Sequence, residues 1–284
     1  MITDGTFAIL EKELKATPSI GEIIINSGFT GVILENNDMG MAMNIRKGSG
    51  FNDSGLIQRF MGLIGMNAFE AAYSLAADTD FITVSVRVAL MNALSRPLME
   101  ADFLREKGYR VDMRQGSHTS QLITNKDTVM IVGFGGNVWP ISRNAKKVYV
   151  SELYPEAFKA TVLNQKGINF GPDCAEIVNA RDAGAYFDRA DIILLTGSSL
   201  VTGTMESILE KCVDKQVILY GATAGFYPEL LFRLGVDEVS TRVVHDTELT
   251  SAFLKNCSQA VERFFPQSTL DLNIRLNPES VNAD

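Results

Sequence analysis

The sequence predicts an α+β domain followed by an α/β domain built on a doubly wound, Rossmann-like parallel sheet. In residues 1–104 short strands precede helices without alternating with them, whereas from residue 127 onward apolar strands alternate with helices. The length of 284 residues fits two domains of about 150 residues each. We therefore expect domains over residues 1–104 and 127–265, a polar linker over 105–126, and a polar C-terminal tail over 266–284.

The first part of the chain is predicted to contain a helix, an antiparallel meander and three further helices. Residues 1–16 carry apolar side chains at helical spacing, and Pro18 ends this helix. Short polar turns separate the expected strands, at residues 22–26, 31–34 and 40–45. Asp53 or Ser54 is the expected N-cap of the next helix. The helices are expected at residues 55–65, 68–77 and 84–94.

The second part of the chain is predicted to form a parallel sheet covered on both faces. Its strands are short, nearly continuous apolar runs, which is typical of strands buried on both sides. They are expected at residues 129–132, 148–151, 175–178, 192–195, 216–220 and 238–244. The intervening helices are expected at residues 155–165, 181–187, 204–212, 228–234 and 246–264, the last one capped by Asp246.

Charge and composition exclude several classes of partner. Lys and Arg number 26 against 34 Asp and Glu, so the net charge is −8 and the surface repels phosphate groups. We therefore expect no nucleic acid and no membrane as a partner. The first residues lack the basic and apolar regions of a signal peptide, which favours a cytoplasmic protein. A small molecule is the expected partner, and a homodimer remains open.

The metal-binding side chains are few and dispersed. The chain has three cysteines and two histidines (Cys174, Cys212, Cys257, His118 and His245), and no C-x-x-C pair occurs. A closed tetrahedral site needs four such ligands close together. We therefore predict no metal site built from the protein's own Cys and His residues, and no cofactor can be named from the sequence.

Glycines and a carboxylate follow the first two strands of the predicted parallel sheet. Gly133, Gly135 and Gly136 come directly after the first strand, where a backbone without side chains lets a ligand approach closely. The dinucleotide fingerprint is incomplete, since Val138 occupies its third glycine position. Glu152 closes the second strand, where a carboxylate can bind a ribose or remain in solvent.

A loop rich in Gly, Ser and Thr follows the strand at residues 192–195. It offers hydroxyl and amide donors to an anionic or polar heterocyclic ligand, and Thr204 is also a candidate cap for the next helix. No histidine lies beside these hydroxyls in sequence, so a serine nucleophile is not supported. Glu152 and Glu206 are the candidate catalytic acid or base. The candidate ligand-binding residues are Asn92, Gly133, Gly135, Gly136, Glu152, Thr196, Gly197, Ser198, Thr202 and Thr204.

Two segments resemble a known family. The run from Asp191 through Thr196-Gly-Ser-Ser to Gly203-Thr204, and the run Val217-Ile-Leu-Tyr-Gly221-Ala-Thr-Ala-Gly, are similar to the heavy-metal chelation family. The helix that carries Asn92 also looks like the family's N-domain helix. The resemblance implies an enolase N-terminal-like domain before the Rossmann-like domain, with the ligand in a cleft between them.

The resemblance also implies a function. It points to condensation or hydrolysis of a pterin, flavin or siderophore-like molecule, with any metal held through a small-molecule chelator. Whether the protein is an enzyme stays open, because the alternatives are a non-enzymatic metal or metallophore binding protein and a methyltransferase-like protein. A convergent acid or base beside the glycine loops would favour an enzyme, and binding of S-adenosylmethionine would favour the methyltransferase.

Overall fold

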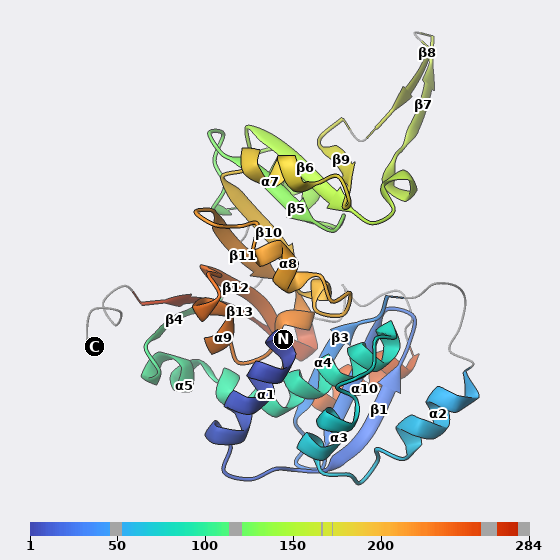
Figure 1. Cartoon of the computed structure of the whole chain (residues 1–284), viewed down its shortest axis with the longest axis vertical. Helices are drawn as coiled ribbons and strands as arrows, with labels where there is room; N and C mark the ends of the chain where they lie inside the picture. The colour runs from blue at the N-terminus through green and yellow to red at the C-terminus, as the bar shows by residue number, and fades with distance from the viewer. Residues whose placement is uncertain (46–52, 114–120, 166, 172, 257–265, 278–284) are drawn as a thin grey trace.

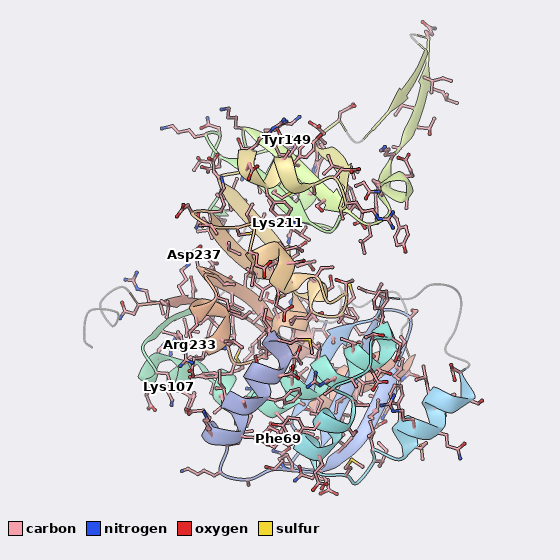
Figure 2. All side chains as sticks on the ribbon, viewed as in Figure 1. Phe69, Lys107, Tyr149, Lys211, Arg233 and Asp237 are labelled. Carbon is pink, nitrogen blue, oxygen red and sulfur yellow. The ribbon has the colours of Figure 1, made fainter. Side chains whose placement is uncertain are left out.

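The protein is a mixed α/β structure with a large mixed sheet, a smaller sheet and a projecting hairpin (Figure 1). The computed structural model describes residues 1–45, 53–113, 121–165, 167–171, 173–256 and 266–277. The smaller sheet lies toward one end of the long axis of the molecule, near Phe69 (Figure 2). The large sheet extends toward the other end, where Tyr149 lies (Figure 2). None of the described helices is both long and apolar enough to span a bilayer.

The smaller sheet is the predicted antiparallel meander. Helix α1 (Ile2–Glu13) precedes strands β1 (Ile20–Ile25), β2 (Phe29–Leu34) and β3 (Met39–Met43), which pair in chain order. Three helices follow: α2 (Ser54–Met61), α3 (Ala68–Ser74) and α4 (Phe81–Ser95). The predicted cap of α2 is Asp53, whose carboxylate accepts hydrogen bonds from the Gly55 and Leu56 amides. The enolase N-terminal-like assignment stays a prediction.

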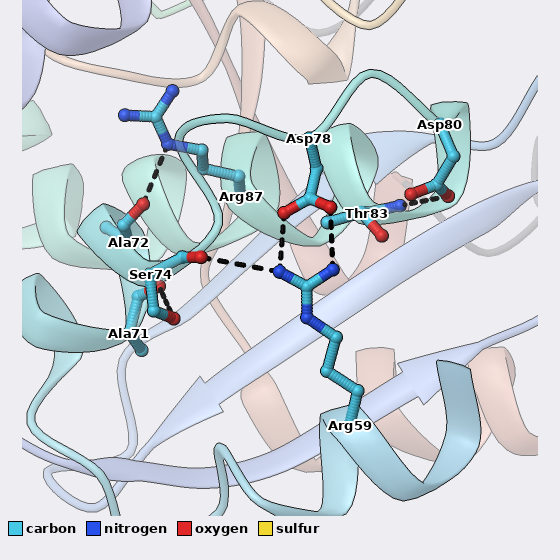
Figure 3. A network of polar contacts seen from close by, with 8 residues as sticks. All are labelled: Arg59, Ala71, Ala72, Ser74, Asp78, Asp80, Thr83 and Arg87. Carbon is cyan, nitrogen blue, oxygen red and sulfur yellow. Dashed lines mark hydrogen bonds and ion pairs between the residues drawn. The ribbon is translucent and has the colours of Figure 1, made fainter. Parts of the chain in front are cut away.

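Polar contacts join these three helices to one another (Figure 3). The Arg59 guanidinium on α2 donates to both carboxylate oxygens of Asp78, with Nη1–Oδ1 at 2.7 Å. This hydrogen bonding holds the pKa of the Asp78 carboxyl below its usual value. Asp80 caps α4 by accepting from the Thr83 amide, and Arg87 Nε donates to the Ala72 carbonyl on α3.

Helix α4 packs directly against β3 at Gly40. A Cβ atom on Gly40 would lie 2.2 Å from the Ala89 carbonyl oxygen and 2.2 Å from the Ala93 amide nitrogen. These are backbone atoms of a helix, so they cannot move aside as a flexible side chain could. Only glycine allows β3 and α4 to approach this closely.

The large sheet has eight strands in the order β4-β13-β12-β11-β10-β5-β6-β9. Six of them are parallel: β5 (Thr128–Val132), β6 (Lys147–Glu152), β9 (Glu176–Asn179), β10 (Ile192–Thr196), β11 (Gln216–Tyr220) and β12 (Glu238–Val244). Numbered along the chain, these six run 3-2-1-4-5-6 from β9 to β12. The order reverses between β5 and β10, which is where ligands bind in open parallel sheets.

Both faces of the parallel strands are buried, as their continuous apolar sequences predict. Met130, Val132, Ile193 and Leu195 belong to one apolar cluster, whereas their chain neighbours, including Val129 and Leu194, belong to another. Short helices connect the strands: α6 (Val138–Ser142), α7 (Gly184–Arg189), α8 (Met205–Leu209) and α9 (Glu229–Arg233), preceded in the chain by η1 (Arg96–Met99) and α5 (Ala101–Glu106).

The segments predicted as a polar linker and a polar C-terminal tail each contribute a strand to the large sheet, and neither strand is among those predicted. Strand β4 (Tyr109–Asp112) lies within residues 105–126, and β13 (Thr269–Leu276) lies within residues 266–284. Strand β13 pairs antiparallel with both β12 and β4, so the sheet is mixed. Leu270, Leu272, Ile274 and Leu276 alternate with polar residues, the pattern of a half-buried strand, and Leu272 and Ile274 are buried.

The helix predicted at residues 155–165 is wrong. A short 3-10 turn, η3 (Pro155–Phe158), is followed by the hairpin of β7 (Thr161–Asn164) and β8 (Gly167–Phe170). The β-branched pair Thr161 and Val162 favours a strand over a helix. The hairpin projects away from the rest of the molecule (Figure 1), and Leu163 and Ile168 are exposed on it.

The two sheets are linked by helix α10 (Thr247–Asn256), which follows β12 and is capped by the Asp246 carboxylate. Leu254 on α10 joins Ile24, Met39 and Met41 in one apolar cluster on the face of the smaller sheet opposite α4. The smaller sheet is therefore covered by one helix from its own part of the chain and one from the C-terminal half.

We expect Gly40→Ala to lower the free energy of unfolding by about 3 kcal/mol, because the added methyl group overlaps the α4 backbone. Chemical denaturation measures this change. The matched control is Gly21→Ala in β1, where the nearest atom would lie at an ordinary 3.4 Å and the change should stay within about 1 kcal/mol. Equal effects of the two substitutions would contradict close packing of α4 on Gly40.

Candidate ligand-binding site

The carboxyl ends of β5, β6, β10 and β11 bring together most of the predicted ligand-binding residues. Gly133 follows β5, Glu152 ends β6, Thr196 ends β10 and Tyr220 ends β11. Because these strands are parallel neighbours, their carboxyl ends lie at one edge of the sheet. This edge is where the order of the strands reverses.

The glycine loop after β5 lies against the end of β10. Gly133 has a φ of +86°, a left-handed conformation that favours glycine. A Cβ atom there would lie 3.4 Å from Cγ2 of Thr196, so the loop and Thr196 are neighbours. Gly135 and Gly136 are exposed, and a Cβ atom on either would meet nothing within 4 Å. The outer half of the loop therefore presents open backbone.

Glu152 holds the glycine loop in place. Its Oε2 accepts a hydrogen bond from the Phe134 amide at 2.9 Å. Its Oε1 accepts from the amides of Leu153 at 2.7 Å and Tyr154 at 3.4 Å. A carboxylate has about four lone-pair sites, so three backbone amides leave about one for a ligand.

The hydroxyl-rich loop forms a compact turn after β10. Thr196 Oγ1 and Ser198 Oγ lie 3.0 Å apart, and both residues belong to the turn that lies against the glycine loop. Gly197 packs on the next loop, because its Cβ would lie 2.8 Å from the amide nitrogen of Ala224 in η5 (Ala222–Ala224). The predicted capping role of Thr204 is wrong, since its side chain makes no cap hydrogen bond and pairs with Thr202 Oγ1 at 2.8 Å.

Tyr220 is a polar residue of this edge that the sequence reasoning missed. Its hydroxyl donates to the Val132 carbonyl at 3.4 Å, so the side chain reaches from the end of β11 across β10 to the end of β5. Burial raises the pKa of Tyr220 to about 12, while a hydrogen bond with Thr196 lowers it and the charge of Glu152 raises it. The phenol therefore stays protonated at neutral pH. Its position as the last residue of a strand at the same edge is the signal that identifies it.

Asn92 and Glu206 make contacts away from the glycine loop. Asn92 is buried on α4, and its Nδ2 donates to the carbonyls of Met41 at 2.6 Å, Thr223 at 3.2 Å and Ala222 at 3.4 Å. It therefore ties β3 to η5, and these three carbonyls lie outside the glycine loop. Glu206 Oε1 accepts from the Ile2 amide at 2.6 Å, at the start of α1.

The metal-binding side chains do not form a cluster in the part of the chain that the structure describes. There, no group of three or more His, Cys, Asp or Glu side chains is placed to hold a metal ion. Burial raises the pKa of the Cys212 thiol to about 11, and its Sγ donates to the Ile208 carbonyl at 3.1 Å. A protonated thiol is a poor metal ligand. His118 and Cys257 lie outside the described residues.

We expect Glu152→Ala to loosen the glycine loop, because the Phe134, Leu153 and Tyr154 amides lose a charged acceptor. A hydrogen bond to a charged group contributes about 1.5–3 kcal/mol, so hydrogen exchange at Phe134 should accelerate at least about tenfold. Exchange measured by mass spectrometry or NMR tests this. The control is Glu156→Ala, which removes only an exposed pair with Lys159. Unchanged exchange at Phe134 in Glu152→Ala would contradict the role given to Glu152.

Comparison with known proteins identifies the family. A family model described as "putative heavy-metal chelation" matches residues 118–267, and a second model with the same description matches residues 8–95. An uncharacterised protein of Methanocaldococcus jannaschii is 22% identical over 200 residues, which cover 68% of this chain and 66% of that protein. The match thus spans slightly less than two thirds of that relative.

Two crystal structures share the fold. A protein of unknown function from Desulfitobacterium hafniense is 13% identical with a TM-score of 0.67, and the alignment covers 95% of this chain and 98% of that one. Another protein of unknown function, from Pyrococcus horikoshii, is 16% identical with a TM-score of 0.67, covering 97% and 100%. Both are described as members of the family that matches residues 118–267. The present chain belongs to this family, described as "putative heavy-metal chelation".

Proposed function

We propose that the edge formed by the ends of β5, β6, β10 and β11 binds a small polar or heterocyclic molecule of the pterin, flavin or siderophore-like class. The observation that carries this proposal is the convergence of the glycine loop, Glu152, Thr196 and Tyr220 at the reversal of strand order. We also propose that the parallel strands form a Rossmann-like domain and that the protein works in the cytoplasm.

The chemistry of the edge suits recognition of a polar ring. Gly135 and Gly136 leave backbone amides accessible, and the hydroxyls of Thr196 and Ser198 add donors and acceptors close to them. Glu152 offers about one further lone pair to a ligand N–H or O–H group. These groups orient a ligand through hydrogen bonds at fixed positions, which is how small-molecule sites obtain specificity.

Condensation or hydrolysis is the reaction that we propose for this edge. Glu152 is its candidate acid or base, because its carboxylate lies beside the open glycines. Glu206 is the weaker candidate, since its carboxylate binds the start of α1. No described histidine stands beside Ser198, so we assign no serine nucleophile.

The family description names metal chelation, and the described donor side chains do not fit a metal ion held by the protein alone. We therefore propose that a metal, where one is involved, arrives bound to a small-molecule chelator. A non-enzymatic metallophore-binding protein is the alternative. A methyltransferase-like protein is the other, supported by Glu152 at the end of the second parallel strand, where a carboxylate can bind the ribose of a nucleoside ligand.

Native mass spectrometry of the purified chain tests the ligand site. We expect a bound small molecule whose occupancy falls at least about tenfold in Gly135→Leu, because a leucine side chain fills the open space over the loop. The matched control is Gly184→Leu on α7, where a Cβ atom also meets nothing within 4 Å. A ligand retained equally by Gly135→Leu and the parent protein would contradict the proposed site.

The same preparation separates the alternatives. Elemental analysis after dialysis should show no stoichiometric zinc, nickel or iron, and about one such ion per chain without a co-purifying small molecule would favour direct metal binding. Turnover of the identified molecule by the chain would favour an enzyme over a binding protein. Calorimetric titration with S-adenosylmethionine tests the methyltransferase. Binding to the parent protein that is lost in Gly135→Leu would favour it.

A further inference from the structure

A cavity lies at the β4 end of the large sheet, beside β4 and β13. Its volume is about 610 Å³, which falls within the roughly 300–1,000 Å³ typical of small-molecule sites. Strands β11 and β12 stand between this edge and the reversal point at β5 and β10. The cavity is therefore separate from the edge described above, and nothing in the proposed function uses it.

The cavity concentrates positive charge in a chain whose net charge is −8. Three arginines from three elements line it, Arg105 on α5, Arg110 on β4 and Arg275 on β13, against one carboxylate, Asp112. Arg105 pairs with Asp102, and Arg275 pairs with Glu238. Arg110 forms no ion pair with any residue in the described ranges. It therefore brings to the cavity a positive charge that no ion pair among the described residues neutralises.

The register places Arg110 directly opposite Arg275 in the antiparallel pair of β4 and β13. Like charges at directly opposed positions destabilise a sheet. Two guanidinium groups side by side suit an anion, because each offers a planar fork of N–H donors that matches a carboxylate or phosphate. Glu238 already neutralises Arg275 through their ion pair, so an anion between the two guanidinium groups would neutralise chiefly Arg110.

Asn273 adds an acceptor to the same cavity. It lies two residues before Arg275 on β13, so the two side chains share one face of the sheet. Asn273 is 6% exposed and lines the cavity, and its Oδ1 has no hydrogen-bond partner in the described part of the chain. A buried acceptor without a donor is unfavourable by about 1–3 kcal/mol. A ligand hydroxyl would supply the missing donor.

We infer that this cavity binds a small hydroxylated polyanion, with its carboxylate or phosphate groups on Arg110 and Arg275 and its hydroxyl donating to Asn273 Oδ1. The arginines account for the charge of the ligand, and Asn273 accounts for its hydroxyl. Leu122 and the apolar part of Tyr109 add an apolar wall to the cavity, which suits the carbon skeleton of such a molecule.

Two pairs of probes test both features in the unmodified protein. Citrate is compared with tricarballylate, which lacks only the hydroxyl, and glycerol phosphate with propyl phosphate. Calorimetric titration should show at least tenfold tighter binding of the hydroxylated member of one pair, and the pair that binds tells carboxylate from phosphate. Binding of none of the four probes at millimolar concentration would overturn the proposal.

Substitutions in the full chain test which residues contact the bound probe. Arg110→Ala, at an exposed position, should weaken binding of both members of the favoured pair at least tenfold, whereas the control Arg181→Ala, at an exposed position beyond β9, should leave it unchanged. Asn273→Ala should remove the preference for the hydroxylated member. Binding in Arg110→Ala equal to the parent, or a wild-type protein that binds both members equally, would overturn the site as assigned. The probe pair tests the hydroxyl without depending on how Asn273→Ala folds.

Discussion

The burial of helix α4 is the constraint on which the rest of the structure depends. Every residue of α4 from Ser85 to Ser95 is buried, so the helix lies within the protein, where a polar group without a partner is unfavourable. Asn92 Oδ1 has no partner among the described residues, whereas Arg87 and Asn92 Nδ2 have partners. Arg87 bonds to Asp4 on α1 and Ala72 on α3, and Asn92 bonds to β3 and η5. These bonds, together with the glycine contact at Gly40, fix elements from both halves of the chain around one helix.

This arrangement extends to the candidate site through the loop η5. Asn92 binds the carbonyls of Ala222 and Thr223, and Thr223 Oγ1 accepts from the Met43 amide at 3.0 Å. On its other side, η5 packs against Gly197 in the hydroxyl-rich loop. The smaller sheet and α4 thus support one wall of the proposed site through Met43 and Asn92. Rigid support of this kind keeps binding groups at fixed positions.

The small-molecule ligand that we propose is consistent with both the family description and the chemistry of the chain. The side chains that bind heavy metals are dispersed in the described residues. Backbone amides and hydroxyls gather at the carboxyl ends of β5, β6, β10 and β11, and guanidinium groups gather beside β4 and β13. These groups recognise polar and anionic molecules, and many molecules of that kind are themselves metal ligands. The site proposed at the ends of β5, β6, β10 and β11 therefore assigns recognition of any metal to the bound molecule.

The sequence by itself determined the elements whose apolar residues recur at a regular, short spacing along the chain. The six parallel strands, the meander and helix α4 carry patterns of apolar residues that depend only on their immediate neighbours along the chain. The same reasoning placed Gly133, Glu152 and Thr196 at one edge, because the carboxyl ends of parallel strands must meet there. Only the tertiary structure decided the pairing of β4 with β13, the projecting hairpin, and the partners of Tyr220, Glu206 and Asn92. Those features depend on contacts between residues far apart in the chain, and no local pattern of residues specifies such a contact.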